Sequence, residues 1–75
     1  MSKAPLIIDV MGESCPIPVK RLRTVLISNP VGEIRLIGDD PESLHDIPAL
    51  LERMGLQPPE VVEIEGGWRF VISAG

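Results

Sequence analysis

The apolar residues of this chain change their spacing several times, and this change of period limits the possible folds more than any other feature. The run from Leu6 to Val10 is apolar and β-branched except for Asp9, and Gly12 follows it, which predicts a short buried strand ending in a turn. From Pro16 onward apolar residues recur every three or four positions, which predicts an amphipathic helix that stops by Asn29-Pro30. Its apolar stripe consists of Val19, Leu22, Val25 and Leu26.

Three further segments have the period of strands. Residues 33–37 alternate between polar and apolar side chains, and Gly38 closes this strand. Residues 61–65 and 68–73 are strand-like and are separated by Gly66-Gly67, a pair typical of a two-residue hairpin turn. Three residues of the last strand share one face and are expected in the core: Trp68, Phe70 and Ile72.

A second helix is expected between these strands, but a proline complicates it. Asp40 is suited to cap a first turn and Pro41 to occupy its first position, whereas Pro48 would remove a backbone donor from a helix running straight through. We therefore expect a break, followed by a main helix from Asp46 to Met54 that stops at Gly55. Its predicted apolar stripe consists of Ile47, Leu50, Leu51 and Met54.

The predicted order is strand, helix, strand, helix, strand, strand, without repeats or linkers. It indicates an α/β two-layer sandwich of β-α-β-α-β-β order, in which a four-stranded mixed sheet carries both helices on one face. We expect residues 1–75 to form one domain. A domain of this size buries only about 60% of the surface that its unfolded chain exposes, so the core should be thin.

Composition excludes several classes of function. One cysteine cannot form an intramolecular disulfide, and Cys15 and His45 are too few for a four-ligand zinc site. The 11 acidic residues outnumber the 7 basic ones, and a net charge of −4 disfavours direct nucleic-acid binding. The run at 6–8 is too short for a signal peptide, and no segment approaches the roughly 20 apolar residues of a membrane span. We therefore expect a soluble, cytoplasmic protein without a membrane partner.

The lone Cys15 lies where the first helix is expected to begin. If Cys15 is the N-cap, then Pro16, Ile17 and Pro18 take the first three helical positions, where prolines cost little. The Ile17 N–H would then be the donor best placed to reach the sulfur. The positive end of the helix dipole should lower the pKa of the thiol below its free value of about 8.5, and it would also favour an anionic persulfide.

The alternative for Cys15 is a buried thiol that acts as a small hydrophobic side chain. The polar neighbours Glu13 and Ser14 and the loop-to-helix position favour partial exposure instead. On spacing alone the two interpretations have about equal support.

Other polar residues have a structural and a functional interpretation. His45 is the only candidate acid or base and would form a Cys-His dyad if the loops after two parallel strands meet, although a solvated histidine is the commoner case. Asp39, Asp40 and Asp46 are expected to be capping and turn residues, with a divalent-ion site as the lesser alternative.

Several motifs together resemble the TusA/SirA-type sulfur-carrier family along nearly the whole chain. The Cys-Pro-x-Pro element is the signature of this family. The matching segments are Asp9-Val10-x-Gly12-x-x-Cys15-Pro16-x-Pro18-Val19, then Gly32-Glu33, then Asp39-Asp40-Pro41-x-x-x-x-Asp46-Ile47-Pro48.

The resemblance implies a small two-layer α/β sandwich that carries sulfur as a persulfide on Cys15, with Gly12, Pro16, Ile17 and Pro18 in support. A cysteine desulfurase, a rhodanese or a related donor would load the cysteine, and a cysteine of an acceptor protein would take the sulfur. Each transfer is the attack of a thiolate on a sulfane sulfur, so no cofactor is needed. Transfer-RNA thiolation, molybdenum-cofactor maturation, sulfur oxidation and thiosulfate assimilation are all compatible with such a carrier.

Two positions depart from the family pattern. Glu13 stands where relatives usually have an apolar residue, and Met11 where a polar or basic residue is common. Charge at the rim of an interface mainly sets partner choice and association rate. Glu13 is thus a candidate docking residue, as are Lys20, Arg21 and Arg23 on the wetter side of the first helix, which otherwise form an ordinary solvated face.

Two other functions are compatible with the sequence. The first is a non-catalytic interaction or regulatory module of the same fold, in which Cys15 is a bystander. The second is a thiol oxidoreductase, which is disfavoured because the chain lacks the second cysteine of a Cys-x-x-Cys motif.

Overall fold

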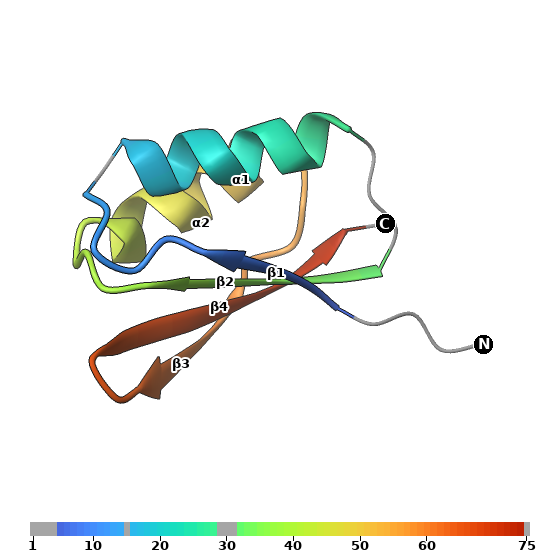
Figure 1. Cartoon of the computed structure of the whole chain (residues 1–75). Coiled ribbons are helices and arrows are strands. Elements are labelled where there is room, and N and C mark those ends of the chain that lie inside the picture. Colours follow the sequence, from blue (N-terminus) through green and yellow to red (C-terminus); the bar gives the residue numbers. More distant parts are fainter. Residues whose placement is uncertain (1–4, 15, 29–31, 75) are drawn as a thin grey trace.

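Six elements follow one another in the predicted order β-α-β-α-β-β in the computed structural model, which describes residues 5–14, 16–28 and 32–74. The sheet order is β1-β2-β4-β3; β1 pairs parallel with β2, and the other two pairs are antiparallel. Both helices lie on one face of this mixed sheet (Figure 1). The predicted two-layer architecture is therefore confirmed. The elements are β1 (Leu6–Asp9), α1 (Ile17–Ile27), β2 (Gly32–Gly38), α2 (Ser43–Arg53), β3 (Glu60–Ile64) and β4 (Gly67–Ala74).

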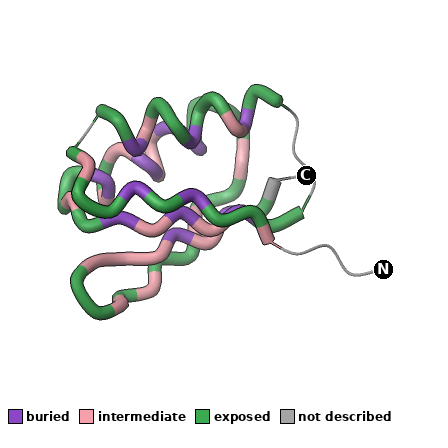
Figure 2. Tube along the Cα trace, in the orientation of Figure 1, coloured by how far each residue is buried: buried purple, intermediate pink, exposed green. Residues whose placement is uncertain are grey.

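The hydrophobic core lies between the helices and the sheet. In Figure 2 the buried positions of both helices face the strands, while their outer sides are exposed. Trp68 is half-buried and packs against this core, so the predicted inward face of β4 is confirmed. The buried apolar residues are Ile8, Val10, Leu22, Leu26, Ile34, Leu36, Ile47, Leu50, Leu51, Phe70 and Ile72.

The first strand is less buried than predicted. Leu6 and Ile7 are 46% and 51% exposed, and within β1 only Ile8 is buried. The reason is that β1 lies at the edge of the sheet and has a neighbour on one side only. Val10 is fully buried just beyond the strand and donates its N–H to the Ile37 carbonyl at 2.8 Å, which continues the ladder.

Helix α1 has the predicted apolar stripe. Leu22 and Leu26 are buried, and Val19 and Val25 pack against the core from its margin. The helix ends at Ile27, and the predicted stop at Asn29-Pro30 lies outside the described residues. None of the described helices has the length and apolar character needed to cross a membrane.

Helix α2 is continuous from Ser43 to Arg53, so the predicted break is wrong. Pro48 lies inside the helix, where an interior proline costs about 3 kcal/mol. The helix persists because Ile47, Leu50 and Leu51 are buried, and each such side chain contributes roughly 1.5–3 kcal/mol. The net balance favours one unbroken helix.

The end of α2 shows one further error and one confirmed prediction. Met54, expected in the apolar stripe, is 37% exposed and follows the last helical residue. Gly55, at a φ of +73°, stops the helix as predicted. Its N–H donates to the Glu52 carbonyl, and the Leu56 N–H donates to the Leu51 carbonyl. These two hydrogen bonds together form a Schellman motif.

The hairpin turn lies one residue earlier than predicted. Ile64 pairs with Gly67, so the two turn residues are Glu65 and Gly66, and Gly66 has a φ of +82°. Gly67 begins β4 and has a different reason to be glycine. A Cβ on Gly67 would lie 2.3 Å from the carbonyl oxygen of Gly38, which shows that the two backbones are in close contact.

Gly67→Ala should lower the free energy of unfolding by about 2 kcal/mol. The added methyl group would clash with backbone atoms of Gly38 and Asp39, which cannot move away as a flexible side chain can. Urea denaturation followed by circular dichroism would measure the change. The matched control is Gly66→Asn, since asparagine tolerates a positive φ and should cost well under about 1 kcal/mol. Equal stabilities for Gly67→Ala and wild type would contradict the close contact.

Leu22→Ala should cost about 3 kcal/mol, because it leaves a cavity beneath the fully buried face of α1. Ile27→Ala on the same helix removes a side chain that is 61% exposed and should cost less than about 1 kcal/mol. The two midpoints of urea denaturation measure this difference. Similar losses in both variants would show that the core is not where the structure puts it.

Candidate functional site

Both helices begin at the same end of the sheet. Since β1 and β2 are parallel, the loops that follow them leave the sheet at one edge (Figure 1). The Gly12 N–H donates to Asp39 Oδ1 at 3.0 Å and joins these two loops. This confirms the prediction that parallel strands would bring the two helix starts together.

The loop after β1 is folded by local hydrogen bonds. The Met11 N–H donates to Asp9 Oδ1 at 3.0 Å, and the Glu13 N–H donates to the Val10 carbonyl at 3.1 Å. Gly12 has a φ of +80°, in the left-handed region that glycine adopts without steric strain. The predicted turn at Gly12 is thus present, and its geometry explains the glycine.

Cys15, the predicted reactive residue, lies outside the described residues. Its neighbours in the chain, Ser14 and Pro16, are both exposed, and Ile17 is 42% exposed. The segment that carries the cysteine is therefore flanked by surface residues on both sides. The partial exposure of Cys15 itself stays a prediction.

The predicted N-cap is displaced by one residue. Pro16, not Cys15, precedes the first helical residue, and its carbonyl accepts the Lys20 N–H at 2.9 Å. The Ile17 N–H donates to the Ser14 carbonyl at 3.0 Å, so the donor expected to reach the sulfur already has a partner.

Pro18 has a role that the sequence analysis missed. Its side chain is fully buried, and with Leu22 and Leu26 it forms an i, i+4, i+8 series on the inner face of α1. The first turn of the helix is therefore held against the core. This spacing was present in the sequence, but Pro18 was interpreted only as a residue that stiffens the approach.

The two aspartates of the loop before α2 accept hydrogen bonds from different loops. Asp40 Oδ1 accepts the Glu42 N–H at 3.0 Å, so Asp40 is a turn residue, whereas the N-cap of α2 is Glu42 and not Asp40 as predicted. Asp39, predicted as a turn or capping residue, accepts a bond from the other loop, which its local sequence did not indicate. In the described part of the chain no group of three His, Asp or Glu side chains is placed to hold a metal ion.

His45 and the basic residues of α1 are all on the surface. His45 is exposed in the first turn of α2, and a Cys-His dyad stays a hypothesis because Cys15 is not described. Lys20, Arg21 and Arg23 are exposed on a helix without acidic residues. Arg35 pairs with Glu33 on β2, whereas the three cations of α1 face solvent.

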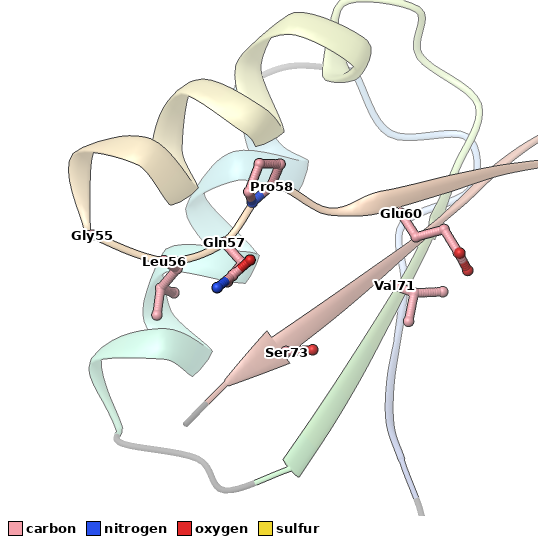
Figure 3. A pocket seen from close by; sticks show the side chains of 7 residues that line it. All are labelled: Gly55, Leu56, Gln57, Pro58, Glu60, Val71 and Ser73. Atoms are coloured by element: carbon pink, nitrogen blue, oxygen red, sulfur yellow. The ribbon is translucent and has the colours of Figure 1, made fainter.

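A cavity lies at the other end of the sheet. It measures about 640 Å³ and lies between the segment that follows α2, the start of β3 and the end of β4 (Figure 3). Ser73 in its wall pairs with Glu33 at the start of β2, whereas Asp39 follows the end of β2. The cavity contains no thiol and is separate from the candidate site. Its lining residues are Gly55, Leu56, Gln57, Pro58, Glu60, Val71 and Ser73.

Comparisons with known proteins give a consistent result. The sequence model of the family described as "Sulfurtransferase TusA" matches residues 6–74. A protein of Archaeoglobus fulgidus named "Putative sulfur carrier protein" is 39% identical over 68 residues, which cover 88% of each chain. A second protein of that name and organism is 31% identical over 69 residues, covering 91% of this chain and 94% of its own. The crystal structure of a SirA-like protein from Desulfitobacterium hafniense matches with a TM-score of 0.80 at 33% identity, covering 93% of this chain and 97% of that chain.

His45→Gln should leave the alkylation rate of Cys15 within about twofold of wild type from pH 6 to 10, because an exposed imidazole is screened by water. The rate with iodoacetamide, measured at each pH, gives the titration curve of the thiol. A curve displaced along the pH axis in the variant would instead support a Cys-His dyad.

Proposed function

Because this chain belongs to the TusA sulfurtransferase family, we propose that it carries sulfur as a persulfide on Cys15 and passes it to a cysteine of an acceptor protein. The observation that carries this proposal is the position of the sole thiol. Cys15 stands between exposed neighbours at the start of a helix, in a chain that the family model matches over residues 6–74. A persulfide requires a thiol, and the chain offers one.

The transfer needs no external oxidant or reductant. The Cys15 thiolate attacks the terminal sulfur of a donor persulfide; a new bond to Sγ forms, the donor S–S bond breaks, and the donor cysteine leaves as a thiolate. In the second step an acceptor thiolate attacks the terminal sulfur on Cys15 and releases the Cys15 thiolate. The sulfane sulfur and its oxidation state move together, so the carrier returns unchanged.

The start of α1 supports an anion in this segment. The N-terminus of an 11-residue helix carries about half a positive charge, which favours a thiolate or a persulfide near it. The Ile17 N–H is already bound to Ser14, and prolines at 16 and 18 have no N–H. The support we propose is therefore the field of the helix rather than a hydrogen bond from Ile17.

The partners in this proposal are two kinds of protein. A cysteine desulfurase, a rhodanese or a related donor loads Cys15, and a protein with a reactive cysteine receives the sulfur. We propose that charged residues near the cysteine select these partners. Glu13 lies shortly before Cys15 in the sequence, and three exposed cations follow it in α1: Lys20, Arg21 and Arg23. A free thiol of this kind persists in a reducing compartment such as the cytoplasm.

The proposal is tested by loading the protein with sulfur and measuring its intact mass by mass spectrometry. Incubation with a cysteine desulfurase and cysteine should add the mass of one sulfur atom to the wild type, and a reductant should remove it. Cys15→Ser should gain nothing. A Ser14→Cys change in the Cys15→Ser background moves the thiol by one position and should load at least about tenfold more slowly, because transfer depends on placement.

A second protein thiol then tests the carrier step. The loaded wild type should lose the added sulfur to the acceptor, and both masses should change by one sulfur atom. Failure of desulfurase and rhodanese donors alike to load the wild type would overturn the proposal. If Cys15→Ser also kept full partner binding and function in cells, the interaction module would be the better description.

A further inference from the structure

Asp39, in the loop after β2, forms a hydrogen bond with the loop that precedes Cys15. Its Oδ1 accepts the Gly12 N–H at 3.0 Å, across 27 positions of sequence. We propose that Asp39 is a positioning residue for Cys15, acting through the Gly12 amide. Its relevance to sulfur transfer rests on the function proposed above, whereas its effect on the thiol does not.

The other hydrogen bonds of this loop are different in kind. The Met11 and Glu13 amides bind Asp9 and Val10, which belong to the same short segment. Such local bonds shape the turn, and Val10 ties its base to β2 through the bond to the Ile37 carbonyl. The bond to Asp39 adds a second link to the end of the central strand β2, at Gly12.

The backbone beneath Asp39 is tightly packed. Gly38 is buried, and a Cβ built on it would lie 3.2 Å from Val10 Cγ2. On its other side, a Cβ built on Gly67 would lie 3.2 Å from the Asp39 Cα. Asp39 itself is exposed, but its backbone follows the buried Gly38 and lies close to Gly67, so the carboxylate that accepts the Gly12 N–H extends from a closely packed segment of backbone.

The adjacent aspartate makes a clear contrast. Asp40 Oδ1 binds the Glu42 N–H within its own loop and serves the start of α2. The Asp39 bond, in contrast, links the loop after β2 to the segment before the cysteine. Ile72, which is fully buried and pairs with Ile34 near the start of β2, provides a control for effects of general destabilisation.

The experiment compares Asp39→Asn with Asp39→Ala. Both variants remove the negative charge, but only asparagine keeps an oxygen that can accept the Gly12 N–H. The difference between them therefore isolates the hydrogen bond from the charge. Ile72→Val, which trims a fully buried side chain toward the other end of β2 and β4, is the control for lost stability, and thermal unfolding of all three variants records any general loss.

Two readouts do not require sulfur transfer. Solvent exchange of the Gly12 amide proton, measured by NMR, should be roughly fivefold faster in Asp39→Ala than in Asp39→Asn. At pH 7 the iodoacetamide alkylation of Cys15 should be several-fold slower in Asp39→Ala than in Asp39→Asn, because a released loop leaves the thiol less often near the start of α1. Ile72→Val should alkylate at the wild-type rate even if its melting temperature falls.

A third readout concerns the proposed function. In loading by a desulfurase, Asp39→Ala should lower kcat more than it raises KM relative to Asp39→Asn, since the acceptor oxygen positions the thiol and does not contact the donor. Equal Gly12 exchange and equal alkylation in the two variants would overturn the inference, as would an equal loss in Ile72→Val. If the two variants differ but no donor loads the wild type, the positioning role holds and the sulfur-carrier proposal fails.

Discussion

The parallel pairing of β1 with β2 is the constraint on which the rest of the structure depends. It directs the ends of both strands to the same edge of the sheet, so that α1 and α2 begin side by side there. The register pairs Ile8 with Leu36 and turns Ile8 and Val10 into the core. A slip of one residue would turn both side chains to solvent, so burial of these two residues fixes the register of an otherwise exposed edge strand.

The two ends of the sheet differ in how closely they are packed. At the end where the helices begin, Gly38 and Gly67 bring β2 and β4 into backbone contact, and Gly38 also contacts Val10. At the opposite end a cavity of about 640 Å³ opens between β4 and the segment after α2. For the sulfur transfer proposed at Cys15, a closely packed base would hold the reactive residue in place better than a cavity. The closely packed end supplies that base.

The sequence predicted the type of each element well, because periodicity reports which side chains must be buried. The stripe of α1 and the inner face of β4 were correct, since both follow from spacing within a single element. The errors were of position. The hairpin turn and the N-cap of α1 were each displaced by one residue, and α2 runs through Pro48. Those positions were set by competing terms, such as burial of Ile47 against the cost of the proline.

The sequence by itself determined the order of the elements, the faces that enter the core and the identity of the only thiol. These properties are local, because each follows from the spacing or count of residues along the chain. The tertiary structure alone decided that β1 is exposed at an edge, that Gly67 must be glycine and that Asp39 binds Gly12. Each of these depends on residues distant in sequence that meet only when the sheet has formed, and no pattern within one segment contains that information.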